Sequence, residues 1–204
     1  MEKSRSIYRL PLYGFVVAVM SLLSGCFYIK MTHLSDGDLE WLKAYGTGLS
    51  VFFISNLGST DTLIVTEKRL WNSTNPFYFS EAGGWTYEAN GGFSYNIKHN
   101  NTKIDGLTNI KRKLNDTLYL DSSLGTLFQT EPLKIANDSC MTVNSTNAHY
   151  SKYAYDITNR IKEYVWHKKY GLIYYKFEDG EEFFREDLLP DSIRPGDFRD
   201  NSDD

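Results

Sequence analysis

The sequence predicts a mainly β protein, built as an antiparallel meander sheet or a partial barrel or sandwich with at most one or two short helices. Fifteen tyrosines, twelve phenylalanines and four tryptophans favour strands over helices. Short apolar or alternating segments are separated by Gly, Asn and Asp residues, which is typical of hairpins. Strands do not alternate with long amphipathic helices, and this argues against a parallel α/β fold.

A short helix is expected near the start of the folded body. Residues 38–46 read DLEWLKAYG and predict one or two helical turns, with Asp36 or Asp38 as the N-cap and Gly46 as the terminator. The preceding segment, residues 26–36, is not a Ser/Gly-rich linker. It either holds the body close to a membrane or joins the fold as a first strand.

Strands and turns follow in order along the chain. Apolar residues at 49–55 and 62–71 flank Gly58 and predict a hairpin. Asn90-Gly91-Gly92 lies between alternating aromatic residues and is the strongest short-range hairpin signal in the chain. The sequence then predicts strands at 107–114 and 117–123, joined through Asn115-Asp116, and an extended segment at 125–136.

A three-stranded antiparallel meander is expected to close the body. Residues 163–167 and 171–177 flank a Lys-Lys-Tyr-Gly turn, and Asp179-Gly180 turns the chain into a third strand at 181–185. Just before the meander, alternation favours a strand, although helical spacing also fits. The alternating residues are Tyr153, Tyr155 and Ile157, and the helically spaced ones are Ile157, Ile161, Tyr164 and Val165.

The amino terminus has the pattern of a secretory signal peptide. A basic start is followed by an uncharged apolar run from Leu10 to Leu23, as in signal peptides. A transmembrane helix needs about 18 or more apolar residues. This run is shorter and is broken by Pro11 and Gly14, so export is the better interpretation.

The end of that run resembles the bacterial lipobox, in which an aliphatic residue and two small residues precede an obligatory cysteine. The matching residues are Leu23, Ser24, Gly25 and Cys26. The resemblance implies that Cys26 receives a thioether-linked diacylglycerol, that cleavage removes residues 1–25, and that the new amino terminus is acylated. Two or more acyl chains hold a protein on a bilayer lastingly.

The chain is therefore expected to have four parts. They are a cleaved lipoprotein signal peptide (1–25), a membrane-proximal segment (26–36), a single β-rich domain (37–187) and an acidic flexible tail (188–204). The tail is rich in Asp and contains Pro190, Pro195 and Gly196. Such a composition buries little apolar surface and stays solvated.

Charge and cysteine content exclude several classes of function. The net charge is −4, and acidic and basic residues are mixed along the body. The sequence therefore predicts no basic patch of the kind that binds nucleic acid. Once Cys26 is lipidated, Cys140 is the remaining thiol, and no internal disulfide can form. We expect Cys140 to be buried or to be an inert surface thiol.

No group of residues has the pattern of a catalytic or metal-binding site. Cys140 and His149 could be imagined as a nucleophile and a base, but no third orienting group is recognisable. The four histidines (33, 99, 149 and 167) lack the spacing of zinc ligands. Asp179, Glu181 and Glu182 are better explained by a turn and the solvent face of an edge strand. We assign no catalytic residue, cofactor or metal, and leave enzymatic activity open.

Three short motifs resemble the D-(S/T)-aliphatic acceptor of the O-glycosylation system in Bacteroidota. Each consists of an Asp, a hydroxyl residue and an aliphatic residue. The resemblance implies possible O-glycosylation at Thr62, Thr117 and Ser192.

Two longer motifs are similar to a group of small lipoproteins of Bacteroidota whose function is unknown. They are D-x-x-W-L-x-x-Y, beginning at Asp38, and W-x-x-x-x-G-L-I-x-Y-x-x-x-D-G, from Trp166 to Gly180. Surface-exported lipoproteins of that phylum carry acidic residues after the cysteine. Residues 27–33 carry none, which implies a periplasmic location, and the missing Asp directly after Cys26 favours the outer membrane.

Two functions from different classes are compatible with these features. The first is a non-enzymatic binding or envelope-assembly lipoprotein that contacts a protein partner with an aromatic-rich sheet. The alternative is a carrier of lipid or another apolar ligand in a curved sheet. A carrier should have an apolar cavity of several hundred Å³, whereas a partner-binding protein should expose a flat aromatic patch.

Overall fold

The computed structural model describes residues 30–74, 86–135, 139–151 and 159–190 and divides into two units. In the first unit, β1 (Lys30–Met31) and β4 (Thr86–Tyr87) form a short parallel pair. The second unit contains Thr32–Asn72 and the chain from Glu88 onward. It holds one large antiparallel sheet, which confirms the predicted mainly β class.

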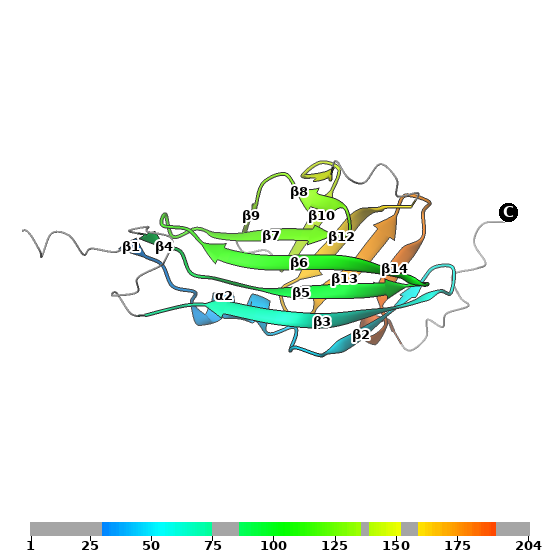
Figure 1. Cartoon of the computed structure of the whole chain (residues 1–204), viewed down its shortest axis with the longest axis horizontal. Coiled ribbons are helices and arrows are strands. Elements are labelled where there is room, and N and C mark those ends of the chain that lie inside the picture. Colours follow the sequence, from blue (N-terminus) through cyan, green and yellow to red (C-terminus); the bar gives the residue numbers. More distant parts are fainter. Residues whose placement is uncertain (1–29, 75–85, 136–138, 152–158, 191–204) are drawn as a thin grey trace, which may run out of the picture. The chain divides into compact units, whose positions relative to one another are not determined.

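The large sheet is curved and nearly closed, as in a barrel (Figure 1). Its edge strands, β10 and β11, are consecutive in the chain and joined by a turn in which Asn147 N–H donates to the Asn144 carbonyl (3.1 Å). The strands in spatial order are β10 (Cys140–Asn144), β12 (Ile161–His167), β13 (Gly171–Phe177), β14 (Glu182–Arg185), β2 (Ser50–Ser55), β3 (Thr60–Trp71), β5 (Asn90–His99), β6 (Thr102–Arg112), β7 (Leu118–Leu124), β8 (Leu127–Gln129) and β11 (Ala148–Tyr150), and β9 (Leu133–Ile135) also pairs with β7.

The two ends of this sheet carry different features, and we call them the distal end and the proximal end. At the distal end, β5 turns into β6 between His99 and Thr102. At the proximal end, Thr32 joins the fold: its hydroxyl donates to the Arg112 carbonyl (2.7 Å) and accepts from Ala89 N–H (2.9 Å). In Figure 1 the arrowheads of β5 and β7 lie at one end and those of β3 and β6 at the other.

Helical structure is confined to short turns. α2 (Asp36–Leu39) continues into the 3₁₀ helix η1 (Glu40–Leu42), and a second 3₁₀ helix, η2 (Glu186–Leu188), follows β14. The predicted helix is thus present, but its N-cap is Ser35 rather than Asp36 or Asp38, and it ends before Gly46. Ser35 caps the helix: its hydroxyl accepts from Asp38 N–H while the Asp38 carboxylate accepts from Ser35 N–H, a capping box.

Most of the predicted hairpins are found. Gly58 turns β2 into β3, Asn115-Asp116 turns β6 into β7, and β12, β13 and β14 form the predicted meander. β14 is not an edge strand, however, because it also pairs with β2. The alternating residues at 153–157 lie outside the described ranges.

The predicted hairpin at Asn90-Gly91-Gly92 is wrong. These residues begin β5, which runs on to His99 and pairs with β3 on one side and β6 on the other. The turn lies instead at Asn100, in the left-handed region (φ 51°). The glycines let the neighbouring strands approach closely, because a Cβ on Gly92 would lie 2.3 Å from the Thr108 carbonyl oxygen.

Aromatic side chains fill the interior of the sheet. Toward the proximal end, the Tyr45 ring lies 5.5 Å from that of Phe93 and 5.6 Å from that of Trp166. Toward the distal end, Tyr175 stacks on Phe183 at 4.9 Å. Burying each of these rings stabilises the fold by about 1.5–3 kcal/mol. The packed rings therefore also fix the strands that form the distal end.

Candidate functional site

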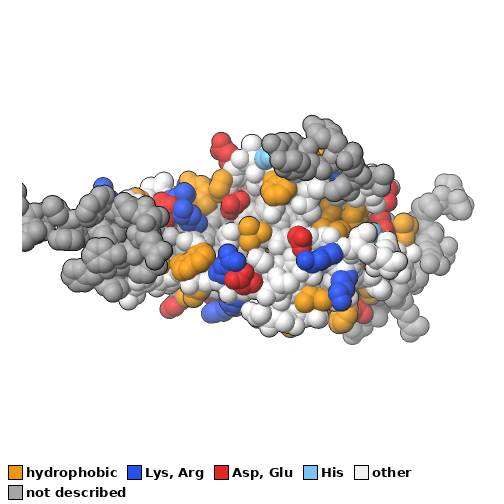
Figure 2. Space-filling view, viewed as in Figure 1, with side chains coloured by type: hydrophobic (Ala, Val, Ile, Leu, Met, Phe, Trp, Pro, Cys, Tyr) orange, Lys and Arg blue, Asp and Glu red, His pale blue; other side chains and the backbone are white. Residues whose placement is uncertain are grey.

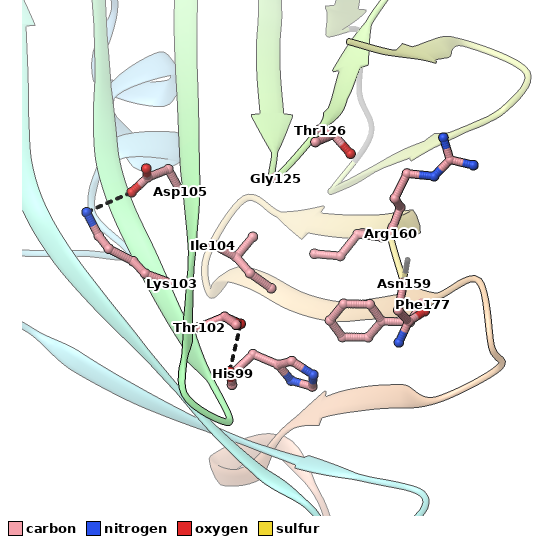
Figure 3. A pocket seen from close by; sticks show the side chains of 11 residues that line it. His99, Thr102, Lys103, Ile104, Asp105, Gly125, Thr126, Asn159, Arg160 and Phe177 are labelled. Carbon is pink, nitrogen blue, oxygen red and sulfur yellow. Dashed lines mark hydrogen bonds and ion pairs between the residues drawn. The ribbon is translucent and has the colours of Figure 1, made fainter. Parts of the chain in front are cut away.

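A pocket opens at the distal end of the sheet, with a volume of about 510 Å³. Side chains from β6, β13, the β7–β8 turn and the start of β12 gather around it (Figure 3). Its lining residues are His99, Thr102, Lys103, Ile104, Asp105, Gly125, Thr126, Asn159, Arg160, Ile161 and Phe177. We call it the distal pocket. Its volume falls within the range of small-molecule sites.

The distal pocket has an apolar floor and a polar rim. Ile161 and Phe177 are almost fully buried, whereas the rim presents hydroxyl, amide and charged groups. The charges are balanced within the protein. The Lys103 ammonium lies 3.0 Å from the Asp105 carboxylate, and the Arg160 guanidinium donates two hydrogen bonds to Glu178 (2.8 and 2.9 Å).

A buried carboxylate lies behind one wall of the pocket. Asp61 occupies an inward-facing position of β3 and is 1 % exposed. The Tyr175 hydroxyl donates to its Oδ2 (2.5 Å), and Nδ1 of His99 lies 3.0 Å from the same oxygen. These three groups, from β3, β5 and β13, form the Asp61–His99–Tyr175 network.

The network fixes the orientation of the His99 ring. The ring is held 4.6 Å from Phe177 and 5.5 Å from Phe183. When Nδ1–H donates to Asp61, Nε2 becomes a hydrogen-bond acceptor. Nε2 lies 3.2 Å from the exposed Asn100 amide. The arrangement gives the pocket wall an acceptor of defined position.

Burial governs the protonation of this network. Burial raises the pKa of Asp61, although its hydrogen bonds to Tyr175 and His99 oppose that change. Burial and the neighbouring Asp61 raise the pKa of Tyr175 well above its ordinary value. Tyr175 therefore stays protonated and acts as the donor.

Asp61→Asn should change the pH dependence of stability. Since burial raises the pKa of Asp61 above its ordinary 3.8, the folded state keeps this proton to a higher pH than the unfolded chain. The stabilising contribution is complete below about pH 3.8 and is lost as the pH rises through the folded pKa. Titrations that both proteins share, including that of His167, whose pKa is lowered by burial, cancel when the two free energies of unfolding are subtracted.

Urea unfolding of both proteins between about pH 3.5 and 6 measures this effect. We expect the free energy of unfolding of the natural protein, relative to Asp61→Asn, to decrease as the pH rises. If the difference in the free energy of unfolding between the two proteins stayed constant, or shifted in favour of the natural protein as the pH rises, the raised pKa of Asp61 would be contradicted.

The described groups around the distal pocket suit non-covalent binding of a ligand. Of the lining residues that the structure describes, none is a Ser or Cys. The hydroxyls are those of Thr102 and Thr126, and Thr102 Oγ1 already donates to the His99 carbonyl (2.8 Å). The described ranges contain no cluster of three or more His, Cys, Asp or Glu residues able to hold a metal ion.

The residues singled out from the sequence lie apart from this pocket or beyond the described ranges. Leu23, Ser24, Gly25, Cys26 and Ser192 fall outside the residues that the structure describes. Thr62 is near the start of β3, paired with Phe52 and Lys98 on either side. Thr117 follows the exposed Asp116 in the β6–β7 turn.

Cys140 and His149 are not cross-strand partners in the structure. Cys140 is exposed on β10, opposite His167 in the register with β12. His149 is on β11, with Nδ1 3.5 Å from the Thr130 hydroxyl. The His167 Nδ1 accepts the backbone N–H groups of Lys169 and Tyr170, so that atom is engaged within its own turn.

The acidic residues near β14 also have structural partners. Asp179 accepts hydrogen bonds from the Asn159 amide (2.7 Å) and Glu181 N–H (3.0 Å). Glu182 forms an ion pair with Lys176. These contacts stabilise the β13–β14 turn and the neighbouring strands.

Comparisons with known proteins leave the geometry as the main guide to function. No family model, curated protein or solved structure matches the chain. Within the residues placed by the structure, we find no helix with the length and apolar character needed to span a bilayer.

Asp61, His99 and Tyr175 were not identified as a site from the sequence. Asp61 precedes Thr62 in one of the three acceptor motifs, and His99 is one of the four histidines that lack the spacing of zinc ligands. One signal was present: Asp61, Leu63 and Val65 alternate along one strand, so an acid shares the inward face with two aliphatic residues. An inward-facing acid in a strand needs a polar partner.

Proposed function

We propose that this protein is a non-enzymatic binding lipoprotein of the bacterial envelope that takes up a small ligand in the distal pocket. The observation that carries the proposal is the pocket wall, where the buried Asp61 carboxylate orients His99 beside a cavity of about 510 Å³. Keeping a carboxylate at 1 % exposure is costly unless it is paired. The network therefore provides a directed acceptor beside an apolar floor.

The lining favours a ligand with both apolar and hydrogen-bonding groups. The Thr126 hydroxyl can donate and accept, and His99 Nε2 is an acceptor shared with the exposed Asn100 amide (3.2 Å). Ile104, Ile161 and Phe177 supply apolar contact. A simple hydrocarbon chain would remove the rim groups from water without replacing their hydrogen bonds, which costs free energy. Because the charges of the rim are paired, the ligand need not carry a net charge.

The surface gives less support to a protein partner docked on the sheet. On the face formed by β3, β5, β6 and β7, hydrophobic side chains are separated by charged and polar ones (Figure 2). Protein-binding patches are contiguous apolar areas of several hundred Å². This view therefore favours the pocket over the sheet face.

A lipid or apolar-ligand carrier is the second candidate, and the apolar floor of the pocket favours it. Against it, the interior beyond the floor is filled: Tyr95, Tyr164 and Trp166 are at most 1 % exposed. A long acyl chain has no channel through such a packed core. The pocket alone would have to hold it.

Native mass spectrometry of the natively purified protein tests the proposal, with Ile104→Trp as the diagnostic variant. Ile104 pairs with the buried Ile97 and lines the pocket, so an indole there fills the cavity. We expect the protein to carry a copurifying small molecule, and Ile104→Trp to lower its occupancy by about tenfold or more. Leu107→Trp, on the same strand but 41 % exposed, is the matched control.

The identity of the bound mass separates the two candidates. A small molecule with polar groups supports the proposed binding function. A fatty acid or phospholipid supports the carrier. A protein without bound ligand in both the natural and Ile104→Trp forms would overturn both candidates.

The proposed location follows from the lipobox at Leu23, Ser24, Gly25 and Cys26. With Cys26 as the lipidated amino terminus, the acyl chains on Cys26 anchor the body to a membrane. We further propose the outer membrane, because no Asp directly follows Cys26, with the body in the periplasm, because residues 27–33 contain no acidic cluster. The similarity to small Bacteroidota lipoproteins and the acceptor motifs at Thr62 and Thr117 agree with this location.

A further inference from the structure

We infer that the proximal end of the sheet docks on the bilayer through Leu70, Trp71 and Leu114, so that the distal pocket is presented on the aqueous side, away from the membrane. The inference rests on the proposed lipidation of Cys26. It adds an orientation and a contact surface, which we call the docking surface.

The chain joins the fold at the proximal end. Thr32 is 8 % exposed and is fixed by two hydrogen bonds, to the Arg112 carbonyl and from Ala89 N–H. Cys26 precedes Thr32 by six residues, which span at most about 21 Å when fully extended. The acyl chains on Cys26 therefore hold the proximal end close to the lipid headgroups.

Exposed apolar side chains occur at this same end. Leu70 and Trp71 are the last two residues of β3 and are 50 % and 49 % exposed. Leu114, in the turn after β6, is 43 % exposed. Leu70 and Trp71 point to opposite faces of β3, so they share the end of the sheet rather than one face. Trp71 pairs with Asn90, and Leu114 N–H donates to Glu88 (3.2 Å), two residues before Asn90, which places Leu114 at the same end.

The chemistry of the docking surface fits a membrane interface. Trp combines a large apolar ring with an N–H donor and is enriched at the headgroup level. Lys111 and Lys113 flank the surface and share Glu88 as a partner (2.8 and 3.3 Å). Their long side chains can reach lipid phosphates while the neighbouring apolar groups enter the interface.

This contact determines where the distal pocket faces. β6 runs from Thr102, which lines the pocket, to Arg112, which binds Thr32, and contains 11 residues. A strand of that length covers about 33 Å. The pocket mouth is thereby held beyond the headgroup region, and its ligand must arrive from the aqueous compartment rather than from the bilayer.

Site-specific fluorescence tests the orientation in the full-length lipidated protein. In a Cys140→Ser background, Trp71→Cys and Leu57→Cys are each labelled with nitrobenzoxadiazole. Leu57 is the matched control because it lies in the β2–β3 turn at the distal end and is 58 % exposed. The proteins are reconstituted in vesicles of phosphatidylethanolamine and phosphatidylglycerol, with or without brominated acyl chains, and their lipidation is checked by intact mass.

We expect emission from position 71 to shift to the blue and to be quenched about twofold or more by brominated lipid, whereas position 57 stays unquenched. With Cys26 shown to be lipidated, equal quenching at both positions, or none at position 71, overturns the orientation but leaves the anchor intact. An unmodified Cys26 overturns the anchor itself, and the docking surface with it. Intact mass thus distinguishes the two failures.

Discussion

Gly92→Ala is expected to lower the free energy of unfolding by about 3 kcal/mol or to prevent folding. Gly92 lies within β5, between Arg69 of β3 and Asn109 of β6. An added Cβ would lie 2.0 Å from Asn109 Oδ1, 2.3 Å from the Thr108 carbonyl oxygen and 2.9 Å from Asn109 Cα. Two of these atoms belong to the backbone, so the strands must separate to relieve the clash.

Chemical denaturation followed by the fluorescence of the buried tryptophans measures this loss. Gly46→Ala is the control, since a Cβ there meets no atom within 4 Å, and it should change stability by about 0.5 kcal/mol or less. If Gly92→Ala proved as stable as Gly46→Ala, the close pairing of β5 with β6 would be incorrect.

The same glycines show where local sequence signals mislead. Asn-Gly-Gly between alternating aromatic residues is typical of a two-residue hairpin. It is equally compatible with a strand whose neighbours approach too closely for a side chain. The position of Thr108 and Asn109 on β6 distinguishes the two, and it follows from the β5–β6 turn at Asn100, which has no such marked local signal.

Turns whose geometry depends on one residue were predicted well. Gly58 and Gly180 have φ angles of 84° and 99°, which favour glycine over other residues. Asp116 adopts a φ of 60°, a region that Asp tolerates better than most residues. In each of these cases the local chemistry of the turn was sufficient, so β2–β3, β6–β7 and β13–β14 were found without knowledge of the fold.

The Asp61–His99–Tyr175 network has no such local origin. Asp61 and Tyr175 are 114 positions apart, and they meet only because β14 pairs with β2 and thereby joins the closing meander to the first hairpin. That long-range pairing is not encoded in any short motif. A sequence pattern can show that Asp61 faces inward, but its partners follow from sheet order.

Cys26→Ser is expected to abolish stable attachment of the mature protein to the outer membrane. The serine hydroxyl cannot form the thioether to diacylglycerol, so the lipoprotein peptidase has no substrate and the cut between Gly25 and Cys26 is lost. Each acyl methylene contributes about 0.8 kcal/mol to membrane binding, and a modified amino terminus carries two or three chains. The amount of mature protein in the outer-membrane fraction should fall by about tenfold or more.

Intact mass and membrane fractionation of the natively expressed proteins check this result. Cys140→Ser is the matched control, because it removes the other thiol of the chain at an exposed position, and it should be lipidated and localised like the natural protein. A Cys26→Ser protein that begins at residue 26 and stays with the outer membrane would show that the acyl chains are not what holds it there. The proximal end of the sheet would then lack the short covalent link from Cys26 to Thr32, and the docking surface alone would have to hold it at the bilayer.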